Sequence, residues 1–280
     1  MEPQPEHEAA LERVLALERR NVAATGALRT ALDAKYVAMR KELTDLVCKV
    51  ALFYEAGWAA AHLCMALLDA YRVRSVQAAP GARGMEPELA TLGLLGVAVA
   101  LVRDPAAGQW PEERSLYLLV SRWRMVRWQL RPQTLAVRPD FLDEFEPCLS
   151  RMVRRAQLQM MSTLEWRLSP LSVATADAVL DAMLAVAAEA AEAEADARSL
   201  CQLGLLRGFS WFYGEAALAA ACVQAARLHA GLEPAWPAAL ARCELARCAL
   251  EALEGDEIEL CVRDLLHAYH EKRPETPRTP

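Results

Sequence analysis

The chain has 280 residues, of which 54% are apolar and 24% are charged, so it is long enough to bury one large hydrophobic core or two of medium size. Its formal net charge of −6 gives no general electrostatic reason to bind nucleic acid or an anionic membrane, because both favour a basic surface. Alanine and leucine are abundant, whereas glycine and aromatic residues are few, so we expect an all-α fold.

The first predicted element is a short amphipathic helix at residues 8–22, which places Leu11, Val14 and Leu15 opposite a charged side. Such a helix docks onto the core or onto a partner. The acidic segment before it lacks the apolar stretch of a secretory signal, and no uncharged apolar run approaches the roughly 20 residues that span a bilayer. We therefore expect a soluble intracellular protein.

The second predicted helix runs from Met39 to Phe53. Its apolar positions recur at helical spacing: Met39, Leu43, Leu46, Val47, Val50 and Phe53. This pattern turns four charged residues outward: Arg40, Lys41, Asp45 and Lys49. The helix is therefore expected to bury one face.

The helices that follow complete a first domain. Residues 58–71 are apolar on nearly all sides, which predicts a central helix surrounded by others, and residues 88–102 predict a third packed helix. Residues 105–147 are the least regular part and contain a helix candidate at 112–130. A helix at 148–168, whose apolar residues include Leu158 and Trp166, closes this half.

A boundary is predicted near Pro170, because proline cannot continue the preceding helix and Ser172 is a suitable N-cap for the next one. The remaining apolar segments predict a second helical domain of similar size. We predict an N-terminal helical extension at residues 1–34 and a first domain at 35–169. A second domain follows at 170–272, and a disordered tail at 273–280.

Two neighbouring segments carry a resemblance to a known family. The stretch "MRKELTDLVCKVALFYEAGWAAAHLCMALLDAYR" resembles the opening of the cyclin box, in which a Met-Arg-led helix precedes a buried helix that ends in a Leu-Asp-Arg-Tyr-like sequence. Residues 92–102 resemble the third box helix and residues 153–172 the fifth helix with its linker. The upstream helix is most similar to that of D-type cyclins.

The resemblance implies two tandem five-helix cyclin-box domains preceded by an N-terminal helix. It also implies a regulatory subunit, not an enzyme, that binds and activates a cyclin-dependent serine/threonine protein kinase in cell-cycle control, in nucleus and cytoplasm. Accordingly we expect no catalytic residue, no cofactor or small-molecule ligand, and neither nucleic acid nor membrane as a partner. The alternative is a divergent cyclin-fold adaptor that no longer activates a kinase.

In cyclins a lysine at the end of the third helix and a glutamate in the fifth contact the kinase. An ungapped count from Trp166 puts the glutamate position at Gln157, so the carboxylate is missing. The corresponding count in the third helix puts the lysine position at Pro105, just after Arg103. A second register, in which "LLVSRW" ends the third helix, gives Arg122 the lysine role.

The family holds Arg-x-Leu substrate peptides in an apolar groove on the first helix. Three residues here fit that groove: Met39, Leu43 and Leu92. Three positions depart from it, since Glu42 takes the central apolar position, Leu46 the tryptophan position and Lys49 the acidic position that receives the peptide arginine. A reversed charge at Lys49 repels such a ligand, so we expect weak docking or none.

Other candidate residues have ordinary interpretations. The pair His267 and His270 lacks the number of ligands that zinc needs, so we expect no metal site. The eight cysteines lie mostly in apolar helical patterns and are expected to be reduced core residues. Thr276 and Thr279, each before a proline, resemble the phosphorylation signals that mark D-type cyclins for removal; the alternative is chance occurrence.

The basic, aromatic segment at residues 122–131 has three interpretations, namely a solvated helix face, a protein-partner surface and a nucleic-acid site. The acidic charge of the whole chain disfavours the last of these.

Overall fold

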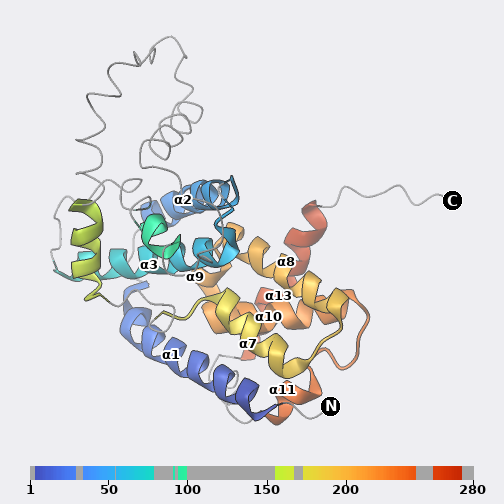
Figure 1. The fold of residues 1–280 in the computed structure, drawn as a ribbon. Coiled ribbons are helices and arrows are strands. Elements are labelled where there is room, and N and C mark those ends of the chain that lie inside the picture. The colour runs from blue at the N-terminus through green and yellow to red at the C-terminus, as the bar shows by residue number, and fades with distance from the viewer. Residues whose placement is uncertain are drawn as a thin grey trace. The chain divides into compact units, whose positions relative to one another are not determined.

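The structure is a computed structural model that describes residues 4–29, 34–53, 55–78, 91, 94–99, 155–166, 173–243 and 255–272 (Figure 1). These residues are helical or lie in turns and short connections, and no strand occurs among them. The predicted all-α fold is therefore confirmed for the described part of the chain. None of its helices combines enough length with enough apolar character to cross a lipid bilayer.

The labelled helices, in chain order, are α1 Pro5–Arg29, α2 Ala34–Phe53, α3 Gly57–Ala78, α7 Ala176–Ala187, α8 Ala191–Arg207, α9 Phe209–Tyr213, α10 Glu215–His229, α11 Ala238–Arg242 and α13 Gly255–Lys272. Residues 94–99 and 155–163 are also helical. The chain forms two compact units. We call Leu32–Pro170 the middle unit, and Met1–Ala31 together with Leu171–Pro280 the terminal unit.

The middle unit contains α2 and α3 packed against each other. The prediction of a central helix at residues 58–71 is confirmed, because the side chains of α3 are buried on several sides: Ala60, Ala61, Leu63, Cys64, Met65, Leu67 and Leu68 are each at most 1% exposed. On α2, Leu43, Leu46, Val47 and Val50 are buried as the apolar spacing predicted. Met39 is only half-buried.

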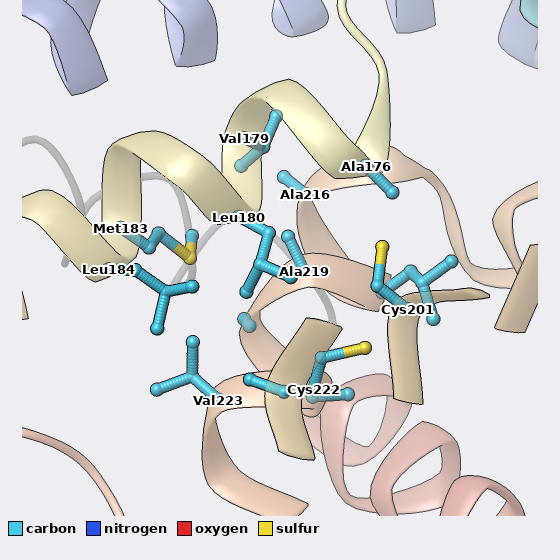
Figure 2. Packing of buried hydrophobic residues seen from close by; sticks show 14 of the residues in the cluster. Ala176, Val179, Leu180, Met183, Leu184, Cys201, Ala216, Ala219, Cys222 and Val223 are labelled. Carbon is cyan, nitrogen blue, oxygen red and sulfur yellow. The ribbon is translucent and has the colours of Figure 1, made fainter. Parts of the chain in front are cut away.

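The terminal unit is built around α10, which packs against α7, α8 and α13. Ten residues of α10 are buried, most of them alanines, and this small side chain lets neighbouring helices approach closely. Figure 2 shows Leu180 of α7 directed toward Ala219 of α10 and Leu184 directed toward Val223. The alanine-rich segment thus forms the centre of a packed core.

Helix α1 belongs to this core although it begins the chain. Leu11 and Leu15 are at most 1% exposed and lie in the same hydrophobic cluster as α7 and α10. The charged residues Glu12 and Arg13 on its other side are exposed, as the amphipathic pattern predicted. The N-terminal helix therefore packs onto residues that follow Leu171.

A carboxylate from α1 also completes the start of α10. Glu18 is only 7% exposed, and its Oε1 accepts a 2.7 Å hydrogen bond from the backbone N–H of Ala216. The preceding Gly214 has φ +88°, and a Cβ there would lie 3.5 Å from Glu18 Oε1. That distance is an ordinary van der Waals contact, so glycine is favoured here by its backbone conformation and not by lack of room.

The predicted N-cap of α7 is wrong. The helix starts at Ala176, and its N-cap is Thr175, whose extended backbone has φ −122° and whose hydroxyl accepts a bond from Ala178 N at 3.3 Å. Serine is in general the better N-cap residue, but the first N–H of the helix, on Ala176, donates to Glu215 Oε2 at 2.8 Å. This tertiary contact fixes the start of α7 four residues after Ser172.

Candidate protein-docking surface

A buried ion pair joins α2 to α3. The Arg40 guanidinium donates from Nε to Asp69 Oδ1 at 2.9 Å and from Nη2 to Oδ2 at 2.8 Å, and Arg40 is 2% exposed. The prediction that Arg40 faces outward is therefore wrong. A prediction from apolar spacing assigns every charged residue to the surface. Here the Asp69 carboxylate compensates the charge of Arg40, so the arginine can be buried.

Tyr36 completes the network from one turn earlier on α2. Its hydroxyl donates to Asp69 Oδ1 at 2.7 Å, and the Arg72 guanidinium lies 5.5 Å from its ring centroid. Burial, followed by the negative charge of Asp69, raises the pKa of Tyr36 well above its usual value. Asp69 thus accepts bonds from two residues of α2, which fixes the register of the two helices.

The five residues of the predicted peptide groove that lie on α2 do not form an apolar surface. Leu43 and Leu46 are at most 2% exposed and belong to the core, whereas Lys49 is exposed and makes a 2.5 Å ion pair with Asp45. Met39 and Glu42 are half-buried, and Leu92 lies outside the described residues. On the described part of α2, the face at these positions is largely polar.

The helical segments 94–99 and 155–163 lie side by side in the middle unit. A Cβ on Gly96 would be 3.3 Å from Gln157 Nε2, so the Gln157 side chain lies against Gly96. Residues of both segments face the core and are at most 2% exposed: Leu94, Leu95, Ala98, Val99, Ala156, Met160 and Leu164. Gln157 itself is half-buried, and Arg103 and Arg122 lie outside the described residues.

The outer face of the 155–163 helix is apolar at two points. Leu158 is 56% exposed and Trp166, in the turn after the helix, is 64% exposed. The sequence pattern counts both among the apolar residues of this helix, but Leu158 and Met160 differ by about 200° around a helix, so only one of them can face inward. That spacing was the signal in the sequence for an exposed apolar surface.

The turn that carries Trp166 has an unusual backbone. Glu165 and Trp166 have φ +53° and +60°, values that residues other than glycine seldom adopt. Glu165 N donates to Ser162 O at 3.0 Å and Trp166 N to Met161 O at 2.9 Å. From α3, Arg74 Nη1 lies 3.4 Å from Thr163 O and 3.5 Å from Glu165 Oε2.

The remaining candidates lie elsewhere. In the terminal unit, His267 Nε2 lies 3.3 Å from Glu271 Oε1, and the rings of His270 and His229 pack edge to face at 6.3 Å. Thr276 and Thr279, together with the basic segment at 122–131, lie outside the described residues.

The described cysteines support the core interpretation. Six are free and buried: Cys48, Cys64, Cys201, Cys222, Cys243 and Cys261. Burial, with a smaller effect of the Asp45 charge, raises the pKa of Cys48 to about 12, and burial likewise raises that of Cys64. These two thiols are therefore protonated and unreactive near neutral pH.

Comparison of the chain with protein-family models gives no match, and comparison with curated protein sequences gives none either.

Proposed function

We propose that this protein is a regulatory subunit of cyclin type, with two tandem five-helix domains, that binds and activates a cyclin-dependent serine/threonine protein kinase in nucleus and cytoplasm. The observation that carries the proposal is the Arg40–Asp69 pair. The resemblance rests on a Met-Arg helix start and a Leu-Asp helix end, and the arginine of the first segment is bonded to the aspartate of the second. The two segments that carry the resemblance are therefore bonded directly to each other.

The surface available for a kinase is the outer face of residues 155–166. Exposed Leu158 and Trp166 offer apolar area, and Gln157 lies at the edge of the same helix. Apolar and aromatic side chains supply most of the binding energy at the centre of a protein interface. By the mechanism of the family, such contacts would hold the kinase helix whose glutamate pairs with the catalytic lysine.

The absence of a carboxylate at residue 157 weakens this contact. A glutamine accepts and donates hydrogen bonds but has no charge, so a charge-assisted bond becomes a neutral one, a loss on the order of 1 kcal/mol. We therefore propose binding that is weaker than with glutamate but retained.

Capture of kinases by the purified full-length protein from a lysate, with identification of those bound, tests the proposal. Gln157→Glu should tighten association several-fold, whereas Gln159→Glu, an exposed position two residues later, should leave it unchanged. Arg103→Glu weakens binding if the first register holds, and Arg122→Glu if the second does. If no kinase is recovered, or if none of the changes alters recovery, the proposal is wrong.

One observation favours the alternative adaptor. Gln157 stands at the position of the family's charged kinase contact, whereas Leu158 and Trp166 present an exposed apolar surface, and such a surface suits any protein partner. The two functions differ in one measurement. A kinase that is captured but whose phosphorylation rate does not rise on addition of this protein identifies an adaptor.

A further inference from the structure

We propose that Arg74 is a positioning residue for the docking surface at residues 155–166. From α3 it holds the turn that directs Trp166 outward, and it acts on a partner through that tryptophan. The inference rests on the proposed function, because it gives the turn a role in partner binding.

The hydrogen bonds at the end of the 155–163 helix show what Arg74 does. The last four carbonyls of a helix have no partner within it. Here the carbonyls of Met160, Met161 and Ser162 accept bonds from the N–H groups of the following turn, and the carbonyl of Thr163 accepts from Arg74. A guanidinium is also favourable at this end of a helix, where the peptide dipoles place partial negative charge.

The backbone conformation explains why the turn needs such a contact. Glu165 and Trp166 both lie in the left-handed region without being glycine. Two successive residues in this region relax toward ordinary angles unless the surrounding structure holds them. Arg74 bridges the last residue of the helix, through the Thr163 carbonyl, to the first residue of the strained pair, through the Glu165 carboxylate.

The direction of Trp166 depends on this turn. Leu164, two residues earlier, is 2% exposed and anchored in the core, whereas the Trp166 side chain is 64% exposed and has little packing to fix it. The two intervening φ values therefore decide where the indole points. Loss of the Arg74 contacts should move the indole while leaving the core intact.

The experiment uses full-length protein with Arg74→Met, which keeps the apolar stem and removes the guanidinium, and Arg74→Lys, which keeps the charge. Arg155→Met, an exposed arginine on the same helix, is the matched control. The first measurement is hydrogen exchange of the peptide segment 160–168, which includes the Trp166 N–H bonded to Met161 O. Exchange should be at least ten-fold faster in Arg74→Met, intermediate in Arg74→Lys and unchanged in Arg155→Met, at similar unfolding midpoints.

The second measurement is capture of the kinase. Arg74→Met should weaken association several-fold, and it should weaken it no further when Trp166 is already alanine, because a positioning residue has no effect once the residue it positions is gone. Additive effects of Arg74→Met and Trp166→Ala would overturn the inference.

The two measurements separate the possible failures. Unchanged exchange in Arg74→Met shows that Arg74 does not hold the turn, whatever is captured. If wild-type protein captures no kinase, the proposed function and the docking role of Arg74 fail together. Faster exchange in that case would still show that the turn depends on Arg74.

Discussion

Arg40 and Asp69 lie 29 residues apart in the sequence, and two nearly parallel hydrogen bonds of 2.9 and 2.8 Å join their side chains inside the middle unit. The side chain of Arg40 is 3% exposed and that of Asp69 is 12% exposed, so neither charge has much access to water. Each is therefore tolerated only because of the other.

Arg40→Met should consequently lower the free energy of unfolding by about 3–5 kcal/mol, since it leaves Asp69 buried without a counter-ion. The double change Arg40→Met with Asp69→Leu should be less destabilised than Arg40→Met alone. Urea unfolding measures both, and Lys41→Met, at an exposed neighbouring position, should stay within about 0.5 kcal/mol of wild type. Additive losses in the double variant would contradict the pairing.

An Arg-x-Leu peptide should not bind α2. Lys49 and its partner Asp45 present a mixed charged surface, and Leu46 is buried in the core, so neither an acidic receptor for the peptide arginine nor an apolar groove is present there. Calorimetric titration of such a peptide should show no saturable binding at micromolar concentration. A dissociation constant near 1 µM, about −8 kcal/mol, would refute this expectation.

Glu18→Ala should destabilise the terminal unit by about 1–3 kcal/mol, because it leaves the buried N–H of Ala216 without this acceptor. Glu18→Gln keeps an acceptor oxygen and loses only the charge near the helix start, so its cost should be smaller, about 0.3–1 kcal/mol. Thermal or urea unfolding gives both values. Glu12→Ala, on the exposed side of α1, serves as the control. An equal loss of unfolding free energy in this variant would contradict a stabilising role of the Glu18–Ala216 hydrogen bond.

Gly204→Ala should destabilise the protein by about 1–2 kcal/mol even though alanine favours helices. A Cβ at Gly204 would lie 2.6 Å from Leu218 Cδ1 and 3.1 Å from its Cδ2, and Leu218 is fully buried between α8 and α10. Leu218→Ala creates space at the same point. Unfolding measurements on the double variant should therefore show a loss smaller than the sum of the two single losses.

Stability above pH 10 should depend on Tyr213. Burial, together with the 2.6 Å bond to Asp264, raises the pKa of its hydroxyl from 10.0 to about 12. The folded state therefore favours the neutral phenol, and its contribution is complete below pH 10 and is lost as the pH rises toward 12. Tyr213→Phe should show a shallower fall in unfolding free energy over this interval, and identical slopes would contradict the assignment.

Sequence reasoning found the helices because composition and spacing are local properties. The alanine-rich α10 and the apolar α3 have too few polar residues to lie at a surface, so their central positions followed from the residues themselves. The same reasoning correctly identified Leu43, Leu46, Val47 and Val50 of α2 as buried, whereas Met39 is half-buried.

Two of the errors share a physical cause, which is that each depended on a partner distant in the sequence. Arg40 is buried because Asp69 receives it, and α7 starts at Ala176 where Glu215 meets its first N–H. Neither partner is visible in a local pattern. The exposure of Leu158 and Trp166 was not predicted, because the two residues were grouped by apolarity alone and not by their angle around the helix.

The terminal unit is assembled from the two ends of the chain, and this has a consequence for its biosynthesis. Glu18 and its hydrogen-bond partner Ala216 are separated by 198 residues. At a ribosomal speed of roughly 5–20 residues per second, α1 waits about 10–40 s before the helix it caps has been made. Leu11 and Leu15 lack their core partners on α7 and α10 until those helices have been made, so the nascent chain should be a substrate for chaperones that recognise exposed amphipathic helices.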